Sequence, residues 1–327
     1  MNITKDHYKI ILTCYALYFL SLSTFQATTQ HWSTITDQDI YVIYNSLLIA
    51  SGFEQEYVDH PAFTTFFFLG FIFKIFSFFF DNFTIQEILL SKDIDKNLQN
   101  LFFIARILNS IYFCFLIFVF IKILELLRIR REICILSLSS ILLFSGAYEL
   151  LFLVRSEILS ILLALTAFYF LLKFINNKKK LYNCLLSGFF FCLAMLAKIQ
   201  VIFLIFVFFL ILPFLFKYFE CEINKNYLIN DKKYYQVSLS ILFIIFIGYL
   251  IFEFFFALPL LIDYVDPIIS LPHYIDVILI TLSIFFYSLL LIFLSKKKYI
   301  NFCEITSTIF TIIIGFVFCL LLFLLLD

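Results

Sequence analysis

Charged residues and helix-breaking residues are both scarce in this 327-residue sequence. Only 14% of the residues are charged, whereas soluble domains carry about 25%. Glycine occurs 6 times and proline 5 times, while 64% of the residues are hydrophobic. A soluble fold has too little interior to hide that much apolar surface from water. The composition therefore excludes a water-soluble protein and makes the lipid bilayer the solvent for most of the chain.

The sequence also lacks an excess of either charge and any grouping of its cysteines. Its 23 basic and 23 acidic residues balance, so nothing in the net charge favours a nucleic-acid partner. The 8 cysteines are scattered, mostly inside apolar stretches, and no Cys-x-x-Cys pair is present. This pattern does not indicate a cysteine metal site or a redox motif.

Apolar stretches recur along the whole chain at lengths close to the roughly 20 residues that a spanning helix needs. They predict an all-α fold, a polytopic transmembrane helical bundle forming a single domain over residues 1–327 with no soluble domain. The ten candidate spans are Ile10–Phe25, Phe63–Phe80, Leu101–Leu124, Ile133–Leu153, Ile158–Ile175, Tyr182–Leu196, Val201–Phe216, Val237–Ile262, Tyr274–Leu294 and Phe302–Leu326.

The distribution of lysine and arginine predicts the orientation of the bundle, because short cytoplasmic loops are enriched in these residues. Four short basic loops are expected on the cytoplasmic side: Arg128–Arg131, Lys178–Lys180, Lys232–Lys233 and Lys296–Lys298. The loop Gln26–Pro61 carries five carboxylates and neither lysine nor arginine. It is expected on the outer side.

One early candidate span conflicts with this orientation. If all ten crossed, the first two basic loops would lie outside. The conflict disappears if Phe63–Phe80, which holds Lys74 near its centre, does not cross. We therefore expect residues 62–80 to form a re-entrant or interfacial helix after an outer catalytic loop at residues 26–61, which leaves about nine spanning helices. The alternative is that the basic-loop rule fails for this chain.

Polar residues from four separate stretches are expected at the outer ends of the helices. Charges at membrane depth are costly and usually functional. Acidic and basic groups gathered on one face suit chemistry on an anionic, lipid-anchored substrate. These residues are Asp37, Asp39, Asp59, His60, Arg155, Glu157, Lys198 and Gln200.

The acidic pair Asp37 and Asp39 follows the first apolar stretch. Held near the bilayer surface, one of these carboxylates can act as the general base on an acceptor hydroxyl. Alternatively, the pair can hold a divalent cation such as Mg²⁺ or Mn²⁺, or it is only a solvated acidic loop.

The cations among these residues suit an anionic group. His60, Arg155 and Lys198 are candidates for binding a phosphate. Each also has a structural alternative. Asp59 and His60 can begin a helix ahead of Pro61, Arg155 and Glu157 can form a salt-bridged turn, and Lys198 can extend its amine out of the membrane.

The ordered set of these motifs resembles the GT-C superfamily of polyprenyl-phosphate-sugar-dependent glycosyltransferases, which includes protein mannosyltransferases and the aminoarabinose transferase of lipid A. The set runs from Asp37-Gln38-Asp39-Ile40-Tyr41 through Gly52 to Asp59-His60-Pro61, Arg155-Ser156-Glu157, Gly188 and Ala197-Lys198-Ile199-Gln200. It spans residues 10 to 215. Gln38 stands where the family often has a second acidic residue, and many relatives are longer.

The resemblance implies roles for particular residues. Asp37 would be the catalytic base on the first outer loop, with Asp39 sharing the role. Tyr41 follows the base, and Gly52 lies near the end of an amphipathic helix. Asp59 and His60 would lie at the donor phosphate, and Glu157 would be the acidic residue of the second outer loop.

The implied reaction is an inverting single displacement at the outer face of a bacterial inner membrane. The acceptor hydroxyl attacks the anomeric carbon of a polyprenyl-phosphate sugar, and His60, Lys198 and Arg155 hold the leaving phosphate. Expected partners are this donor and membrane lipid. Three alternatives stay open: a transporter or flippase, a polysaccharide polymerase that handles lipid-linked sugars, and a structural membrane subunit.

Overall fold

The computed structural model describes a defined part of the chain. The described residues are 5–34, 38–56, 62–80, 82–143, 153–177, 180–198, 200–201, 204, 207–209, 211–212, 215 and 302–324. The chain divides into two compact units, one of residues Met1–Phe206 with Ile312–Asp327 and the other of Val207–Thr311. Nearly all described residues belong to the first unit.

All regular elements in the described part are helices, so the predicted all-helical class is confirmed there. The elements are α1 (Lys5–Thr29), η1 (Trp32–Thr34), α2 (Gln38–Ser51), α3 (Phe63–Ser77), α4 (Ile85–Leu90), α5 (Ile94–Leu126), α6 (Arg131–Leu143), α8 (Ser156–Asn176), α9 (Leu181–Ala197) and α14 (Phe302–Leu324). The predicted spans Val237–Ile262 and Tyr274–Leu294, and most of Val201–Phe216, lie outside the described residues.

Three helices in the described part are long and apolar enough to cross a bilayer: Ile10–Thr29, Ile94–Leu126 and Ser156–Asn176. The chain is therefore an α-helical membrane protein, although the described residues show fewer spans than the nine predicted. The longest of the described helices, α5, has 33 residues and so extends over about 50 Å. Because the hydrocarbon core is about 30 Å thick, one or both ends of α5 project beyond it.

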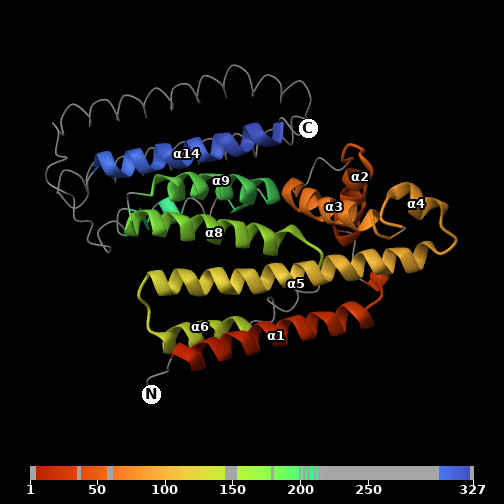
Figure 1. Cartoon of the computed structure of the whole chain (residues 1–327), viewed down its shortest axis with the longest axis horizontal. Coiled ribbons are helices and arrows are strands. Elements are labelled where there is room, and N and C mark those ends of the chain that lie inside the picture. The colour runs from red at the N-terminus through yellow and green to blue at the C-terminus, as the bar shows by residue number, and fades with distance from the viewer. Residues whose placement is uncertain are drawn as a thin grey trace, which may run out of the picture. The chain divides into compact units, whose positions relative to one another are not determined.

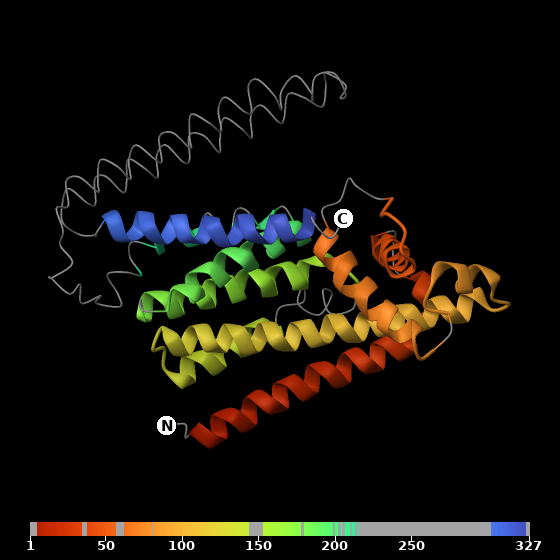
Figure 2. The same cartoon turned by 45° about the horizontal axis from the view of Figure 1, so that its top comes forward.

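The helices α1, α5, α8 and α9 lie side by side in that order (Figures 1 and 2). The C-terminal end of α1 lies beside the beginning of α5, where Trp32 Nε1 donates to Asp95 Oδ1 at 2.7 Å and the Trp32 amide donates to Gln99 Oε1 at 2.8 Å. The beginning of α8 and the end of α9 lie at this same end. We call it the polar end, meaning the end at which α1 and α9 stop and α5 and α8 start.

The short helices α2, α3 and α4 lie between α1 and α5 in sequence and gather near the polar end (Figure 1). Helix α2 stops at Gly52, whose φ of +79° suits a residue without a side chain. Helix α4 begins with a complete capping box between Thr84 and Glu87. An apolar core that includes Phe73, Leu101 and Phe102 joins these helices to α5.

Near its middle, α9 crosses the part of α14 that begins at Ile312 very closely. A Cβ added to Gly188 would lie 1.9 Å from the backbone oxygen of Ile312, and one added to Gly315 would lie 2.1 Å from the oxygen of Leu185. Close backbone approach at small residues is a common way for membrane helices to pack. Gly188 is therefore explained by packing in this structure.

Candidate functional site

Asp39, in the first turn of α2, is the most buried of the carboxylates described at the polar end, with no exposed surface. Its Oδ2 accepts a hydrogen bond of 3.0 Å from the amide of Val154, which lies 115 residues later. Its Oδ1 lies 3.9 Å from Nε of Arg155. Asp39 therefore fastens the start of α2 to the segment that leads into α8.

The surroundings of Asp39 also set its acidity. Burial raises the pKa of its carboxyl above the ordinary value, because it penalises the charged form. The hydrogen bond from Val154 and the positive charges of Arg155 and Arg106 oppose this rise. A carboxyl with a raised pKa is a stronger base toward an alcohol than an ordinary aspartate.

Arg106 is the largest fully buried side chain of the described residues, with 2% of its surface exposed. It comes from α5, and its charge acts on Asp39. Its Nη1 donates to the carbonyl oxygen of Gln30 at 2.7 Å, just beyond the end of α1. One helical turn deeper, Asn109 Nδ2 donates to the carbonyl oxygen of Leu153 at 2.6 Å. Arg106 and Asn109 thus tie α5 to both α1 and the entry to α8.

The pair Lys198 and Glu157 joins α9 to α8. Lys198 Nζ donates to Glu157 Oε1, across 41 residues of sequence. Lys198 caps the end of α9, and Glu157 lies in the first turn of α8. Both side chains are partly exposed, at 29% and 23%. The charge of Glu157 also acts on Asp39, so this pair and the Asp39–Arg155 pair belong to one cluster.

The charge cluster, as we call Asp39, Arg106, Arg155, Glu157 and Lys198, contains three cations and two carboxylates. One positive charge is therefore in excess. Helix α8 adds to it, because the side chain of its N-cap residue Arg155 makes no hydrogen bond to the first amides and a helix N-terminus favours anions. The cluster is therefore suited to a singly charged anion.

Several buried polar atoms of the charge cluster have no hydrogen-bond partner within the described part of the chain. They are Asp39 Oδ1, Arg106 Nε, Arg106 Nη2, Arg155 Nε and Glu157 Oε2. A buried polar atom left unpaired costs about 1–3 kcal/mol. Asp39 Oδ1 and Arg155 Nε still face each other as an ion pair at 3.9 Å. Buried polar groups are normally paired with protein or water, so the other three atoms indicate a place where a polar ligand or water binds.

The remaining predicted site residues lie partly outside this cluster. Tyr41 is 42% exposed on α2. Gln200 is exposed in the turn after α9. Asp37, Asp59 and His60 lie outside the described residues, so their predicted roles stay predictions. Of the nine residues proposed from the sequence, the structure brings Asp39, Arg155, Glu157 and Lys198 together.

No group of three or more His, Cys, Asp and Glu side chains in the described residues is arranged to hold a metal ion. The alternative of a divalent cation on Asp37 and Asp39 involves a residue outside that part and stays a prediction. Asp39 Oδ2 accepts from the Val154 amide, and Oδ1 lies 3.9 Å from Arg155 Nε.

A second polar group fastens the same end of the molecule. Asp95 accepts hydrogen bonds from Trp32 and from His31, whose Nε2 lies 3.2 Å from Asp95 Oδ2. His31 and Asp95 are both well exposed, at 46% and 66%. The group joins η1 to the first turn of α5 on the water-exposed surface.

Arg106 is not among the site residues predicted from the sequence. The available signal was a lone arginine within an otherwise apolar stretch, which usually marks a functional or paired group in a membrane helix. Comparisons of the chain with protein-family models, with curated proteins and with solved structures find no match. The resemblance to the GT-C superfamily therefore stays a prediction from the motifs.

Proposed function

We propose that the chain is a membrane glycosyltransferase that takes a sugar from a polyprenyl-phosphate donor at its polar end. One observation carries the proposal: charged residues from α2, α5, α8 and the end of α9 meet in a single cluster that keeps unpaired buried polar atoms. Four stretches far apart in sequence supply that cluster. Two charged residues are enough for a salt bridge that only holds two helices together, so the five residues of the charge cluster favour a further role.

The charge of the cluster suits the proposed donor. A polyprenyl-phosphate sugar is a phosphodiester with one negative charge, and the cluster has one positive charge in excess. Arg155 and Lys198 are each 29% exposed and can contact the phosphate, while the buried Arg106 adds its positive charge behind them. The first amides of α8 supply further donors. Such pre-arranged donors stabilise the charge that builds up on a leaving phosphate.

In the proposed reaction an acceptor hydroxyl attacks the anomeric carbon of the donor sugar. Its oxygen forms the new glycosidic bond as the bond from that carbon to the phosphate oxygen breaks. The bonding electrons leave with the polyprenyl phosphate, and the hydroxyl proton passes to a carboxylate. The phosphate leaves without protonation, so one base is enough, in contrast to glycoside hydrolysis.

We assign the base role to Asp37 and a positioning role to Asp39. Asp39 has no exposed surface, and one oxygen is held by the Val154 amide, so it is poorly placed to touch an acceptor. Asp37 is the residue before α2 begins at Gln38. Fixing the first turn of α2 through Asp39 also limits where Asp37 can lie.

The proposed orientation places the polar end outside the cell. At the opposite end of α5, Arg128 and Arg130 lie between α5 and α6 and Arg131 begins α6. Lys180 precedes α9 at that same end. Basic residues at this end favour the cytoplasm. A transporter is less favoured, because it would place its charged groups near the middle of the bilayer, whereas Arg155, Glu157 and Lys198 lie at helix ends.

The proposal can be tested with the purified full-length chain in lipid vesicles that contain radiolabelled polyprenyl-phosphate sugars. Donor binding and release of polyprenyl phosphate are measured separately, with membrane extract supplying acceptors. Asp37→Asn should bind donor but release no polyprenyl phosphate, and Lys198→Ala should bind it about tenfold more weakly, as expected for the loss of one charge-assisted contact.

A matched control is Lys122→Gln, which removes a cation at the opposite end of α5, where Lys122 pairs with Glu125 and lies over the ring of Phe118. It should bind and turn over donor as the unaltered chain does. Equal donor affinity in Lys198→Ala and Lys122→Gln would remove the phosphate role. Normal turnover in Asp37→Asn would remove the assignment of the base.

A further inference from the structure

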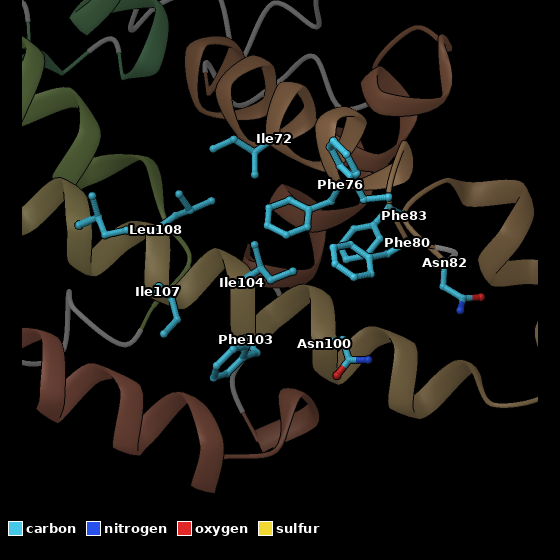
Figure 3. A pocket seen from close by; sticks show the side chains of 12 residues that line it. Ile72, Phe76, Phe80, Asn82, Phe83, Asn100, Phe103, Ile104, Ile107 and Leu108 are labelled. Carbon is cyan, nitrogen blue, oxygen red and sulfur yellow. The ribbon is translucent and has the colours of Figure 1, made fainter.

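The described residues contain a large apolar pocket between α3 and α5, separate from the charge cluster. Its volume is about 900 Å³. Figure 3 shows Ile72 and Phe76 reaching from α3 toward Ile104 of α5, with Asn82 and Asn100 toward one end. This volume lies at the upper end of the range for small-molecule sites, about 300–1,000 Å³. The pocket is large enough for a sizeable apolar group.

Helix α5 separates this pocket from the charge cluster. The pocket is lined by Ile104, Ile107, Leu108 and Ile111, which are half-buried and recur on one face of the helix. Arg106 belongs to the opposite, fully buried face. A ligand in the pocket is therefore not in contact with the charge cluster, and the pocket is a second site.

We propose that this pocket binds one acyl chain of a bilayer phospholipid, with the lipid phosphate at Asn82 and Asn100. The polar residues lie only at the end nearest the beginning of α5, and the rest of the lining is apolar. Lys96 is exposed one turn before Asn100 on the same face of α5. It offers a positive charge to an anionic headgroup.

The length of the pocket distinguishes an acyl chain from a polyprenyl chain. Along α5 the lining runs from Asn100 to Ile111, a distance of roughly 16 Å. The hydrocarbon core of a bilayer is about 30 Å thick, so the pocket is as deep as one leaflet. A phospholipid chain has this reach, whereas a polyprenyl carrier tail is several times longer.

The pocket is also continuous with the surface that faces lipid. Helix α5 is a candidate membrane span, and Phe79 and Phe80, which line the pocket, expose 76% and 58% of their surface. Large apolar side chains exposed at membrane depth contact acyl chains as a matter of course. Because the pocket opens among these exposed side chains, bilayer lipid can enter it directly. The inference does not depend on the proposed sugar transfer.

Photocrosslinking tests the inference on the full-length chain in vesicles of phosphatidylcholine and phosphatidylglycerol. A trace of phosphatidylglycerol carries a diazirine in one acyl chain, and labelled residues are mapped by mass spectrometry. Labelling between Phe103 and Ile111 should exceed that at Phe115 and Phe118 several-fold. These two controls lie on the same helix and are 57% and 56% exposed to lipid.

Two variants sharpen the test. Ile104→Trp fills the pocket and should abolish the excess labelling, while Phe118→Trp should leave it intact. Lys96→Gln changes a surface residue, so it can still test the inference if Ile104→Trp fails to fold. In this variant unlabelled phosphatidylglycerol should compete about fivefold more weakly with the labelled lipid, because one surface cation is lost.

Two results would overturn the inference. One is even labelling along the lipid-facing side of α5. The other is stronger labelling of the pocket by a diazirine-bearing polyprenyl phosphate than by the phospholipid, which would assign the pocket to the carrier lipid instead.

Discussion

Replacing Asp39 separates two ways in which its carboxylate can hold the polar end together. Asp39→Ala removes the charge and the acceptor of the Val154 amide, while Asp39→Asn removes the charge and keeps an oxygen for that amide. An unpaired buried amide costs about 1–3 kcal/mol, so Asp39→Ala should lower the free energy of unfolding by about that amount. Asp39→Asn should stay within about 1 kcal/mol of the unaltered chain, because burial penalises the charge that it removes.

The effect of the Asp39 charge on stability should also change with pH, in a direction that its pKa determines. Burial places the pKa of Asp39 in the folded chain above the ordinary value of 3.8. A carboxyl of this kind stabilises the fold below its ordinary pKa, and that contribution is lost as the pH rises through the folded-state pKa. The unaltered chain should therefore lose stability relative to Asp39→Asn as the pH rises above the ordinary carboxyl pKa of 3.8 and through the raised pKa of Asp39.

The assay is reversible unfolding of the purified chain in detergent, followed by the fluorescence of Trp32. Trp32 is the only tryptophan, and its ring lies 6.0 Å from that of Phe102 near the same end. Equal destabilisation by Asp39→Ala and Asp39→Asn would show that the charge, not the hydrogen bond, holds this end. A gain in stability relative to Asp39→Asn as the pH rises would contradict the direction of the pKa shift.

Two further predictions concern the contact between α9 and α14. Gly188→Ala should destabilise the chain by at least about 2 kcal/mol, because its Cβ would lie 1.9 Å from a backbone oxygen of α14; a melting temperature equal to that of the unaltered chain would contradict this crossing. The buried thiols of Cys192 and Cys319 are hydrogen-bonded to each other, so copper phenanthroline should join them in the full-length chain, and proteolytic fragments holding α9 and α14 should stay linked until reduced. Fragments that separate without reductant, while a control thiol at the exposed Cys14 still reacts with maleimide, would mean that the two helices do not meet there.

The hydropathy of the sequence predicted the helical class and most of the described helices, because lipid requires long apolar stretches. It placed the start of α5 at Leu101, whereas the helix begins at Ile94. Residues 94–100 are mostly polar. Their helical form depends on contacts with partners such as Trp32, and a hydropathy profile does not include such contacts. Helix α4 was not predicted, although its capping box at Thr84 and Glu87 is readable in sequence.

For the candidate site, sequence reasoning predicted that Asp39, Arg155, Glu157 and Lys198 would lie at one end, since each falls at a break between apolar stretches. The pairing of Lys198 with Glu157 was not predicted, because it depends on how α8 and α9 are rotated against each other. The burial of Arg106 was not predicted either, because it requires the end of α1 to reach α5.

The contact between the end of α1 and the start of α5 has a consequence for how the chain can change. Gln30 and Asp95 both lie at that contact, so the sixty-odd residues between them leave and rejoin the bundle at one point. Within this stretch, Asp39 accepts from the Val154 amide and Thr64 donates to the Leu193 carbonyl, so a replacement segment must keep both residues. A chimaera that carries a foreign segment between Gln30 and Asp95 and retains Asp39 and Thr64 is a practical way to graft a different acceptor preference onto the proposed donor site.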